Sequence, residues 1–192
     1  LAECKKLLKE YPFKFDDESV SIMDGADEGA YQWLTMNYLL GNLANGGADH
    51  DGDVQTVAAV DLGGGSVQLA YQVPPESVAN APDGYITKLK ALGHSFDVYT
   101  RSHLGHGLMA ARAAVLAQAE ERGGSPCVHA GYDGVYEYAG KTYKASARDS
   151  GSDHASCYDV AVAALGVDKA CERPKQCSFD GAWGGEPGAG SK

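Results

Sequence analysis

The chain has 192 residues, enough for one domain or for one lobe of a larger fold plus part of another. Its 16 Lys and Arg stand against 26 Asp and Glu, a formal charge of −10. That acidity disfavours nucleic acid as a partner, because phosphate binding requires a concentrated basic surface. Hydrophobic residues make up 44% of the chain, so it can form a real core. No apolar run approaches the ~18–20 residues of a membrane span, so we expect no membrane span in this segment.

The first third of the chain alternates between helical and extended patterns. Apolar residues recur at helical spacing over 1–11 and stop before Pro12, which predicts an amphipathic helix. A short strand is predicted over 20–23, and a buried helix over 26–43. The near-continuous apolar run over 54–62 is typical of a strand that is covered on both faces.

Glycines separate the next elements. Gly63–Gly65 lie between the strand over 54–62 and an alternating strand over 66–73, so the two strands are predicted to form a hairpin. A second hairpin is predicted over 85–99, with its turn at Gly93.

The rest of the chain returns to helices. An alanine-rich periodic stretch predicts a helix over 104–121, and short aromatic strands are predicted within 135–143. The last helix is predicted over 156–165, with Gly166 as its C-terminal cap. Because strands mix with helices throughout, the predicted class is α/β with a mixed sheet.

Four of the five cysteines lie in the last third of the chain. None forms a C-x-x-C pair, which weighs against a zinc ribbon or a thioredoxin-like site. An even set of four suits two disulfides in an oxidising compartment, and scattered buried thiols are the alternative. The five are Cys4, Cys127, Cys157, Cys171 and Cys177.

The sequence DLGGGSVQ, from Asp61 to Gln68, combines groups that suit phosphate chemistry. Backbone N–H groups at a glycine turn can approach phosphate oxygens with no side chain intervening. Asp61, at the end of a strand, is placed to hold a divalent cation directly or through water. Ser66 and Gln68 lie two apart on a strand, hence on one face, where they can orient a water or a phosphoryl oxygen. A plain hairpin, whose glycines serve only the turn, is the alternative.

A second candidate lies at the start of the helix predicted over 26–43. Asp27 and Glu28 stand where helix N–H groups point at anions. Helix capping alone would explain two acidic residues there. The other interpretation is that one of them is a general base for a water nucleophile.

Two further groups have simple structural explanations. His103 and His106 are three apart and could ligate a metal, but no third ligand is nearby in the sequence. We therefore expect histidines that face solvent or have their own hydrogen-bond partners. The tyrosines within 132–143 could stack a nucleobase, although alternating aromatic residues on a strand are the usual reason for such a pattern.

These motifs together resemble the apyrases. The sequence from Asp61 to Gln68 resembles the fourth apyrase conserved region, and Gly25–Trp33 with Asn37–Asn42 resembles the third. The similarity is closest to plant-type apyrases, the nucleoside triphosphate diphosphohydrolases. It spans nearly all of the chain, continuing through the segments 99–107, 126–127, 131–134 and 177–183.

The resemblance implies a mixed-sheet α/β lobe of an actin/hexokinase/Hsp70-type two-lobed fold. Residues 1–24 would then be the end of the N-terminal lobe. Residues 25–192 would form most of the C-terminal lobe, which would be incomplete at its C-terminus. The implied reaction is hydrolysis of terminal phosphates of nucleoside tri- and diphosphates, with Ca²⁺ or Mg²⁺ as cofactor. The implied location is extracellular or in the lumen of the secretory pathway.

The resemblance also implies that parts of the family pattern lie outside this chain. The first two conserved regions would precede Leu1, and the fifth region and the segment that clamps the base would follow Lys192. The partner of this lobe would thus be the N-terminal lobe of a longer parent chain. Transition-state charge must be met by donors from both lobes, so we expect the 192-residue chain alone to be inactive.

Matched by position to the family, Glu28 is the catalytic carboxylate that activates the attacking water, and Asp27 does not occupy that position. Asp61 matches the residue that binds the metal through water. The remaining matches are the phosphate-contacting turn, at Gly63, Gly64 and Gly65, and the residues that position the water, Ser66 and Gln68.

The cysteines also match the family. Cys127 with Cys157, and Cys171 with Cys177, correspond to family disulfides, which leaves Cys4 over. Two other classes of function stay open. One is a nucleotide-binding or scaffold protein without turnover, and the other is a different phosphohydrolase or kinase of the same superfold, such as an exopolyphosphatase.

Overall fold

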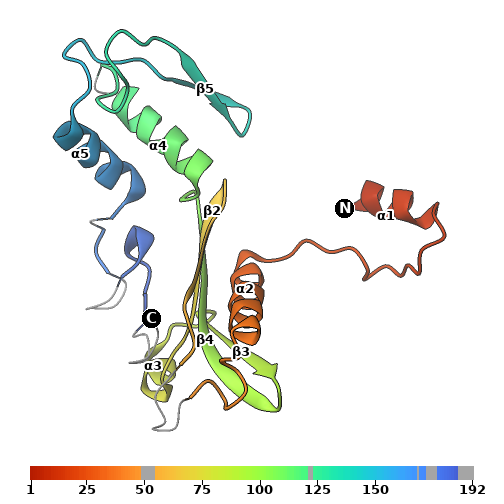
Figure 1. The fold of residues 1–192 in the computed structure, drawn as a ribbon. Helices are drawn as coiled ribbons and strands as arrows, with labels where there is room; N and C mark the ends of the chain where they lie inside the picture. The colour runs from red at the N-terminus through yellow and green to blue at the C-terminus, as the bar shows by residue number, and fades with distance from the viewer. Residues whose placement is uncertain (49–54, 121–122, 168, 172–176, 186–192) are drawn as a thin grey trace.

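The computed structural model describes residues 1–48, 55–120, 123–167, 169–171 and 177–185. A four-stranded antiparallel sheet stands at the centre of the molecule, with helix α2 on one face and the C-terminal segment on the other (Figure 1). Its strand order is β1-β2-β4-β3. The bounds of these strands are Ala59–Leu62 for β1, Ser66–Gln72 for β2, Ile86–Ala91 for β3 and His94–Leu104 for β4.

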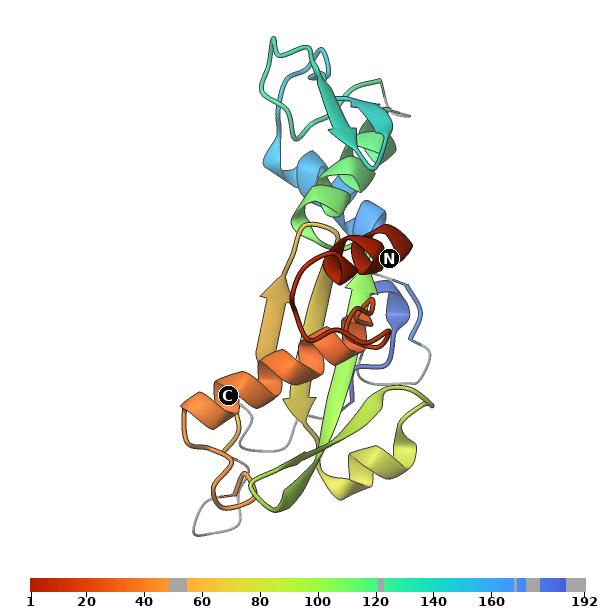
Figure 2. The same cartoon turned by 90° about the vertical axis from the view of Figure 1, so that its right-hand side faces the viewer.

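A smaller layer lies at one end of this sheet, where two helices pack on each other next to a two-stranded hairpin (Figure 2). The hairpin consists of β5 (Val135–Tyr138) and β6 (Lys141–Lys144). The helices of the chain are α1 (Ala2–Lys9), α2 (Gly25–Leu39), α3 (Pro75–Asn80), α4 (Leu108–Glu120) and α5 (His154–Leu165), with a 3₁₀ turn over Phe179–Gly181.

The first core cluster lies between α2 and the sheet. Its fully buried large side chains include Trp33 of α2, and Phe96 and Val98 of β4. Gly29 lets the helix come close to β2, because a Cβ atom there would lie 3.3 Å from the Cβ of Gln68. Close packing of α2 therefore places its first turns directly over the middle of the sheet.

Side-chain hydrogen bonds hold the described residues just before β1, and one of them runs from Thr56 Oγ1 to Gln72 Oε1 of β2 at 3.0 Å. The buried Asn37 donates from Nδ2 to the carbonyl of Val57 at 3.0 Å, and its Oδ1 accepts from the N–H of Val57 at 2.8 Å. The strand predicted over 54–62 accordingly begins only at Ala59, and residue 54 lies outside the described residues.

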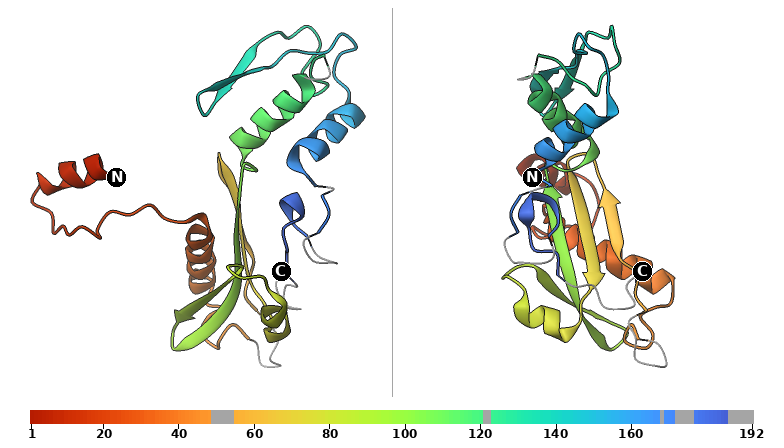
Figure 3. Two further views of the ribbon diagram at one scale, coloured as in Figure 1. Left: turned by 180° about the vertical axis from the view of Figure 1, so that it is seen from behind. Right: turned by 90° about the vertical axis from the view of Figure 1, so that its left-hand side faces the viewer.

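The opposite face of the sheet carries a second core cluster. Tyr99 of β4 is fully buried there and donates from its hydroxyl to the carbonyl of Trp183 at 3.0 Å. Tyr85 and Trp183 meet edge to face with ring centroids 5.8 Å apart. The view from behind shows the C-terminal segment and α3 on this side of the sheet, away from α2 (Figure 3, left).

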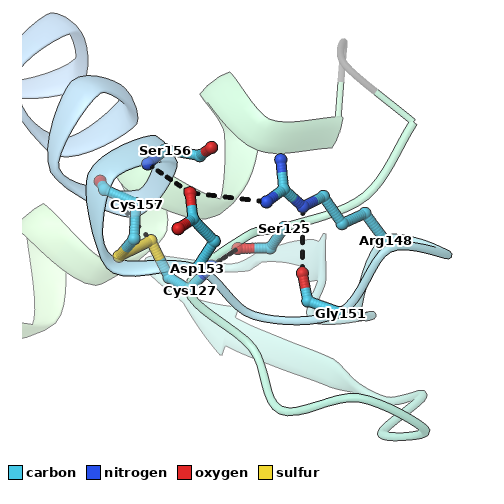
Figure 4. The surroundings of a disulfide bond; sticks show 7 residues. All are labelled: Ser125, Cys127, Arg148, Gly151, Asp153, Ser156 and Cys157. Carbon is cyan, nitrogen blue, oxygen red and sulfur yellow. Dashed lines mark hydrogen bonds and ion pairs between the residues drawn. A yellow bond between two sulfur atoms is a disulfide. The ribbon is translucent and has the colours of Figure 1, made fainter.

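A disulfide joins the loop after α4 to the first turn of α5. Cys127 is bonded to Cys157, and next to it Asp153 caps α5 by accepting from the N–H of Ser156 at 2.7 Å (Figure 4). Arg148 lies 3.6 Å from the same carboxylate. A second bond joins Cys171 to Cys177, and Cys4 is free and exposed. These are the pairs that the apyrase resemblance implies.

Helix α1 stands apart from the sheet, and none of its residues is buried (Figure 1). The strand predicted over 20–23 is wrong: residue 20 lies in a bend, residues 21–23 have no regular secondary structure, and Ile22 is 83% exposed. An apolar run alone does not make a strand, because the strand also needs a neighbour with which to exchange backbone hydrogen bonds.

The predicted α/β class is confirmed. The sheets differ from the prediction, which expected a mixed sheet of parallel and antiparallel strands. All pairings between the described strands are antiparallel, and parallel pairing occurs there only as an isolated bridge between Ser125 and Ala147. The helix predicted from residue 104 starts at Leu108, because Leu104 still pairs with Ser66 as part of β4. The boundary of the lobes at residue 24 stays a prediction. Within the described segments, no helix has the length and apolarity needed to cross a membrane.

Candidate active site

The β1–β2 hairpin sets three polar side chains in a row across the sheet. Asp61 of β1 pairs with Gln68 of β2, and Gln68 pairs in turn with Ser102 of β4. Residues directly opposite each other in an antiparallel sheet project from the same face. The row lies on the face that α2 covers, because the neighbouring Ala59 and Ala70 on that face belong to the core cluster under α2.

Gln68 is the central member of this row and is only 2% exposed. Its Nε2 donates to Ser66 Oγ at 2.6 Å and to Ser102 Oγ at 3.1 Å. Ser66 and Gln68 thus lie together on one strand face, as their spacing predicted. Ser102 has no place among the predicted site residues, because strand register across 34 residues cannot be read from the sequence.

The glycine turn uses its carbonyl groups to hold helix α4. The carbonyl of Gly63 accepts from the N–H of Leu108 at 2.9 Å, and that of Gly64 accepts from Met109 at 2.9 Å. The N–H groups of Gly64 and Gly65 have no acceptor among the described residues. The turn therefore presents donors on one side while its acceptors are already used, which suits an anion.

The glycines of this turn have close neighbours at the position of a Cβ atom, but none of them has a positive φ angle. Gly63, Gly64 and Gly65 are absent from the residues with positive φ, so the turn itself does not require glycine. A Cβ atom at Gly64 would lie 3.2 Å from Met109 Sδ, and one at Gly65 would lie 3.3 Å from the hydroxyl of Tyr138. Both neighbouring atoms belong to side chains, so these contacts are close but do not bear on whether the turn also binds a ligand.

The acidic residues at the start of α2 are not its side-chain cap. Asp24 provides the cap, since its Oδ1 accepts from the N–H of Ala26 at 2.8 Å. Asp27 and Glu28 follow in the first turn and are both exposed. Side-chain capping of α2 therefore does not explain Asp27 and Glu28, because Asp24 is the capping residue.

Glu28 and Asp61 line the same cavity, which has a volume of about 540 Å³ and lies between α2 and β1. Gln32, one helical turn after Glu28, also lines it and donates from Nε2 to Asp61 Oδ2 at 2.5 Å. Sequence reasoning missed Gln32, although its four-residue spacing from Glu28 placed both on one side of the helix. The structure thus brings two candidate carboxylates together, although Ser66 and Gln68 do not line this cavity.

The residues present fit a weakly held divalent cation. The described part of the chain has no group of three or more His, Cys, Asp and Glu side chains able to hold a metal. Mg²⁺ is commonly held by one or two carboxylates together with waters and substrate phosphates. Asp61, oriented by Gln32, offers one such carboxylate.

His103 and His106 lie on the sheet face opposite to this site, near Phe179 and Asp180. His103 is only 6% exposed, and its Nε2 has no hydrogen-bond partner among the described residues, so the expectation of a solvent-facing or hydrogen-bonded histidine is wrong for it. His106 does have its own partners, with Nε2 lying 3.1 Å from the carbonyl of Leu165 and 3.4 Å from Asp180. Burial, followed by the nearby His106 and Arg101, lowers the pKa of His103 to about 4, against the opposing effect of Asp180.

This lowered pKa predicts a loss of stability in mild acid. An unfolded chain binds a proton at His103 near pH 6.5, whereas the folded chain does so only near pH 4. The contribution of His103 is thus fully present above pH 6.5 and is lost as the pH falls toward 4. We expect this loss to be about 1–2 kcal/mol after allowance for solvent screening.

Urea unfolding at pH 7 and pH 4.5 measures the effect, with a His103→Gln variant as the control. The variant should lose less stability between the two pH values than the natural chain does. Equal losses in both proteins would contradict the assignment to His103.

The comparisons with known proteins agree with the family resemblance of the sequence. Residues 2–191 match the model of the GDA1/CD39 (nucleoside phosphatase) family, so the chain belongs to that family. It is 43% identical to "Probable apyrase 2" of Oryza sativa subsp. japonica, over 100% of this chain and 41% of that protein. It is 41% identical to "Apyrase 1" of Arabidopsis thaliana, over 90% of this chain and 36% of that protein.

An animal relative and a solved structure are also similar. The chain is 37% identical to human ectonucleoside triphosphate diphosphohydrolase 6, over 82% of this chain and 33% of that protein. A nucleoside triphosphate hydrolase from Neospora caninum aligns with a TM-score of 0.46 and 24% identity, over 65% of this chain and 25% of its own. The chain thus spans about two fifths or less of the length of these relatives.

Proposed function

We propose that this chain is part of an apyrase-like enzyme that hydrolyses the terminal phosphates of nucleoside tri- and diphosphates by metal-assisted attack of water. The observation that carries the proposal is the cavity that Glu28 and Asp61 share, together with the glycine turn after Asp61, where the N–H groups of Gly64 and Gly65 have no acceptor among the described residues. Family membership supports the same class of reaction.

Each group would have a distinct task in the reaction. Glu28 accepts a proton from the attacking water, whose oxygen forms a new bond to phosphorus as the bond to the leaving nucleotide oxygen breaks. Ser66 and Gln68 orient that water, and the N–H groups of Gly64 and Gly65 meet the negative charge on the phosphoryl oxygens.

Asp61 would hold Ca²⁺ or Mg²⁺ through water, with Gln32 fixing one of its carboxylate oxygens. A bound cation would neutralise part of the negative charge on the phosphates. Asp61 itself is held near the end of β1, where it pairs with Gln68 of β2.

We also propose that the parent protein is secreted or resides in the lumen of the secretory pathway. The two disulfides support this location, because disulfides persist in oxidising compartments. The net charge of −10 supports small-molecule substrates over nucleic acid.

The N-terminal lobe of the parent chain would complete the site. A phosphate-release assay of this chain alone and of the longer protein tests that requirement. With ATP or ADP and a divalent cation, we expect release by the longer protein and none above blank by the 192-residue chain. Turnover by the short chain would contradict the need for a second lobe.

The same assay separates the enzyme classes when polyphosphate is added as a third substrate. Preference for polyphosphate over ATP and ADP would favour an exopolyphosphatase. Binding of nucleotide by the longer protein without any phosphate release would favour a protein that only binds or serves as a scaffold.

A further inference from the structure

Ser102 lies where the helix that carries Glu28 touches the strand that carries Gln68. Its Oγ accepts from Gln68 Nε2 at 3.1 Å. On its other side it meets the first residue of α2, since a Cβ atom at Gly25 would lie 2.4 Å from Ser102 Oγ and 2.6 Å from its Cβ. One side chain thus contacts both halves of the candidate site.

The contacts of Gln68 account for both hydrogens of its amide nitrogen. A carboxamide has two N–H donors, and those of Gln68 go to the hydroxyls of Ser66 and Ser102. Because both donors are used, the carbonyl oxygen Oε1 is the group left to accept a hydrogen bond from water. Without Ser102, one donor would lose its partner at a side chain that is almost wholly buried, and the amide could turn about its last bond.

We propose that Ser102 is a positioning residue that fixes the carboxamide of Gln68, so that Oε1 faces the attacking water. The expected effect on kcat rests on the proposed hydrolysis. The expected orientation of the Gln68 amide rests only on the hydrogen bonds. Ser102 touches neither the substrate nor the reacting atoms in this proposal, and it acts through Gln68.

A Ser102→Ala variant of the full-length protein tests the proposal kinetically. We expect kcat to fall by about three- to tenfold, the factor that corresponds to one neutral hydrogen bond, with KM unchanged. Ser95→Ala is the matched control, because Ser95 lies in the same strand but is exposed at its far end. That control should keep the natural kcat.

A double-mutant cycle separates positioning from a general structural effect. In a Gln68→Ala background, Ser102→Ala should change kcat by less than about twofold, because the amide through which Ser102 acts is gone. A loss that is fully additive with that of Gln68→Ala, or an unchanged kcat in the single variant, would overturn the proposal.

A crystal structure of the Ser102→Ala variant gives a readout that does not depend on turnover. The Gln68 amide should be rotated or occupy two conformers, with Ser66 as its remaining partner. The same single orientation as in the natural protein would overturn the proposal. If the natural full-length protein releases no phosphate from any nucleotide, the proposed function fails, and this structure still decides the role of Ser102.

Discussion

A Glu28→Gln substitution in the full-length protein is expected to lower kcat by about 10²–10⁴-fold, the usual contribution of a positioned general base. Gln keeps the size of Glu28 at the edge of the shared cavity but cannot accept the proton of the attacking water. Nucleotide should still bind, because the glycine turn and Asp61 are unchanged. Phosphate release and equilibrium binding of ATP, measured on the same preparation, check both parts.

The neighbouring carboxylate provides the control for this experiment. Asp27 is exposed and lies in the same helical turn, but it does not line the cavity that holds Glu28 and Asp61. Asp27→Asn makes the same change of charge and should keep kcat within about twofold of the natural value, as for a surface substitution. Equal losses in the two variants would point to net charge, and an unchanged kcat in Glu28→Gln would leave a protein that only binds nucleotide.

Gly107→Ala is expected to destabilise the protein by about 3 kcal/mol, at the upper end of the usual cost of overpacking. A Cβ atom there would lie 2.4 Å from the backbone nitrogen of Ser66 and 2.6 Å from the carbonyl carbon of Gly64. Backbone atoms cannot turn aside as a flexible side chain can, so the turn and the start of α4 must separate. The displaced turn should also raise the KM for nucleotide, and urea unfolding with phosphate release measures the two effects.

Gly64→Ala is the matched control for the stability measurement. The added methyl group would meet Met109 Sδ at 3.2 Å, and Met109 is a flexible side chain that is 47% exposed. We expect a cost of less than about 1 kcal/mol, the range of tolerated changes in packing. If both variants lose the same stability, the tight contact between Gly107 and the turn does not limit the fold.

The local parts of the site were predictable from sequence, and the parts that depend on distant packing were not. Asp61, Ser66 and Gln68 lie within one hairpin, so an alternating strand and a glycine turn were enough to place them together. Ser102 reaches Gln68 only through the pairing of β2 with β4, and Gln32 reaches Asp61 only because α2 packs on β1. Neither contact leaves a periodic signal in the chain.

The errors in the predicted fold have the same origin. The segment over 20–23 has the composition of a strand, but it has no neighbouring strand among the described residues and stays unpaired. The run before Ala59 is held by Asn37, a polar residue that the apolar pattern of its helix did not single out. The disulfide pairs needed the family resemblance, because cysteine spacing alone does not fix connectivity.

Strand β4 separates two very different environments with consecutive residues. Ser102 faces α2, whereas Arg101 and His103 on either side of it face the opposite surface. If β4 slipped by one position along β2, a guanidinium or an imidazole would replace a hydroxyl beside Gln68. The β2–β4 register that sets Ser102 beside Gln68 therefore keeps Arg101 and His103 away from the face that α2 covers.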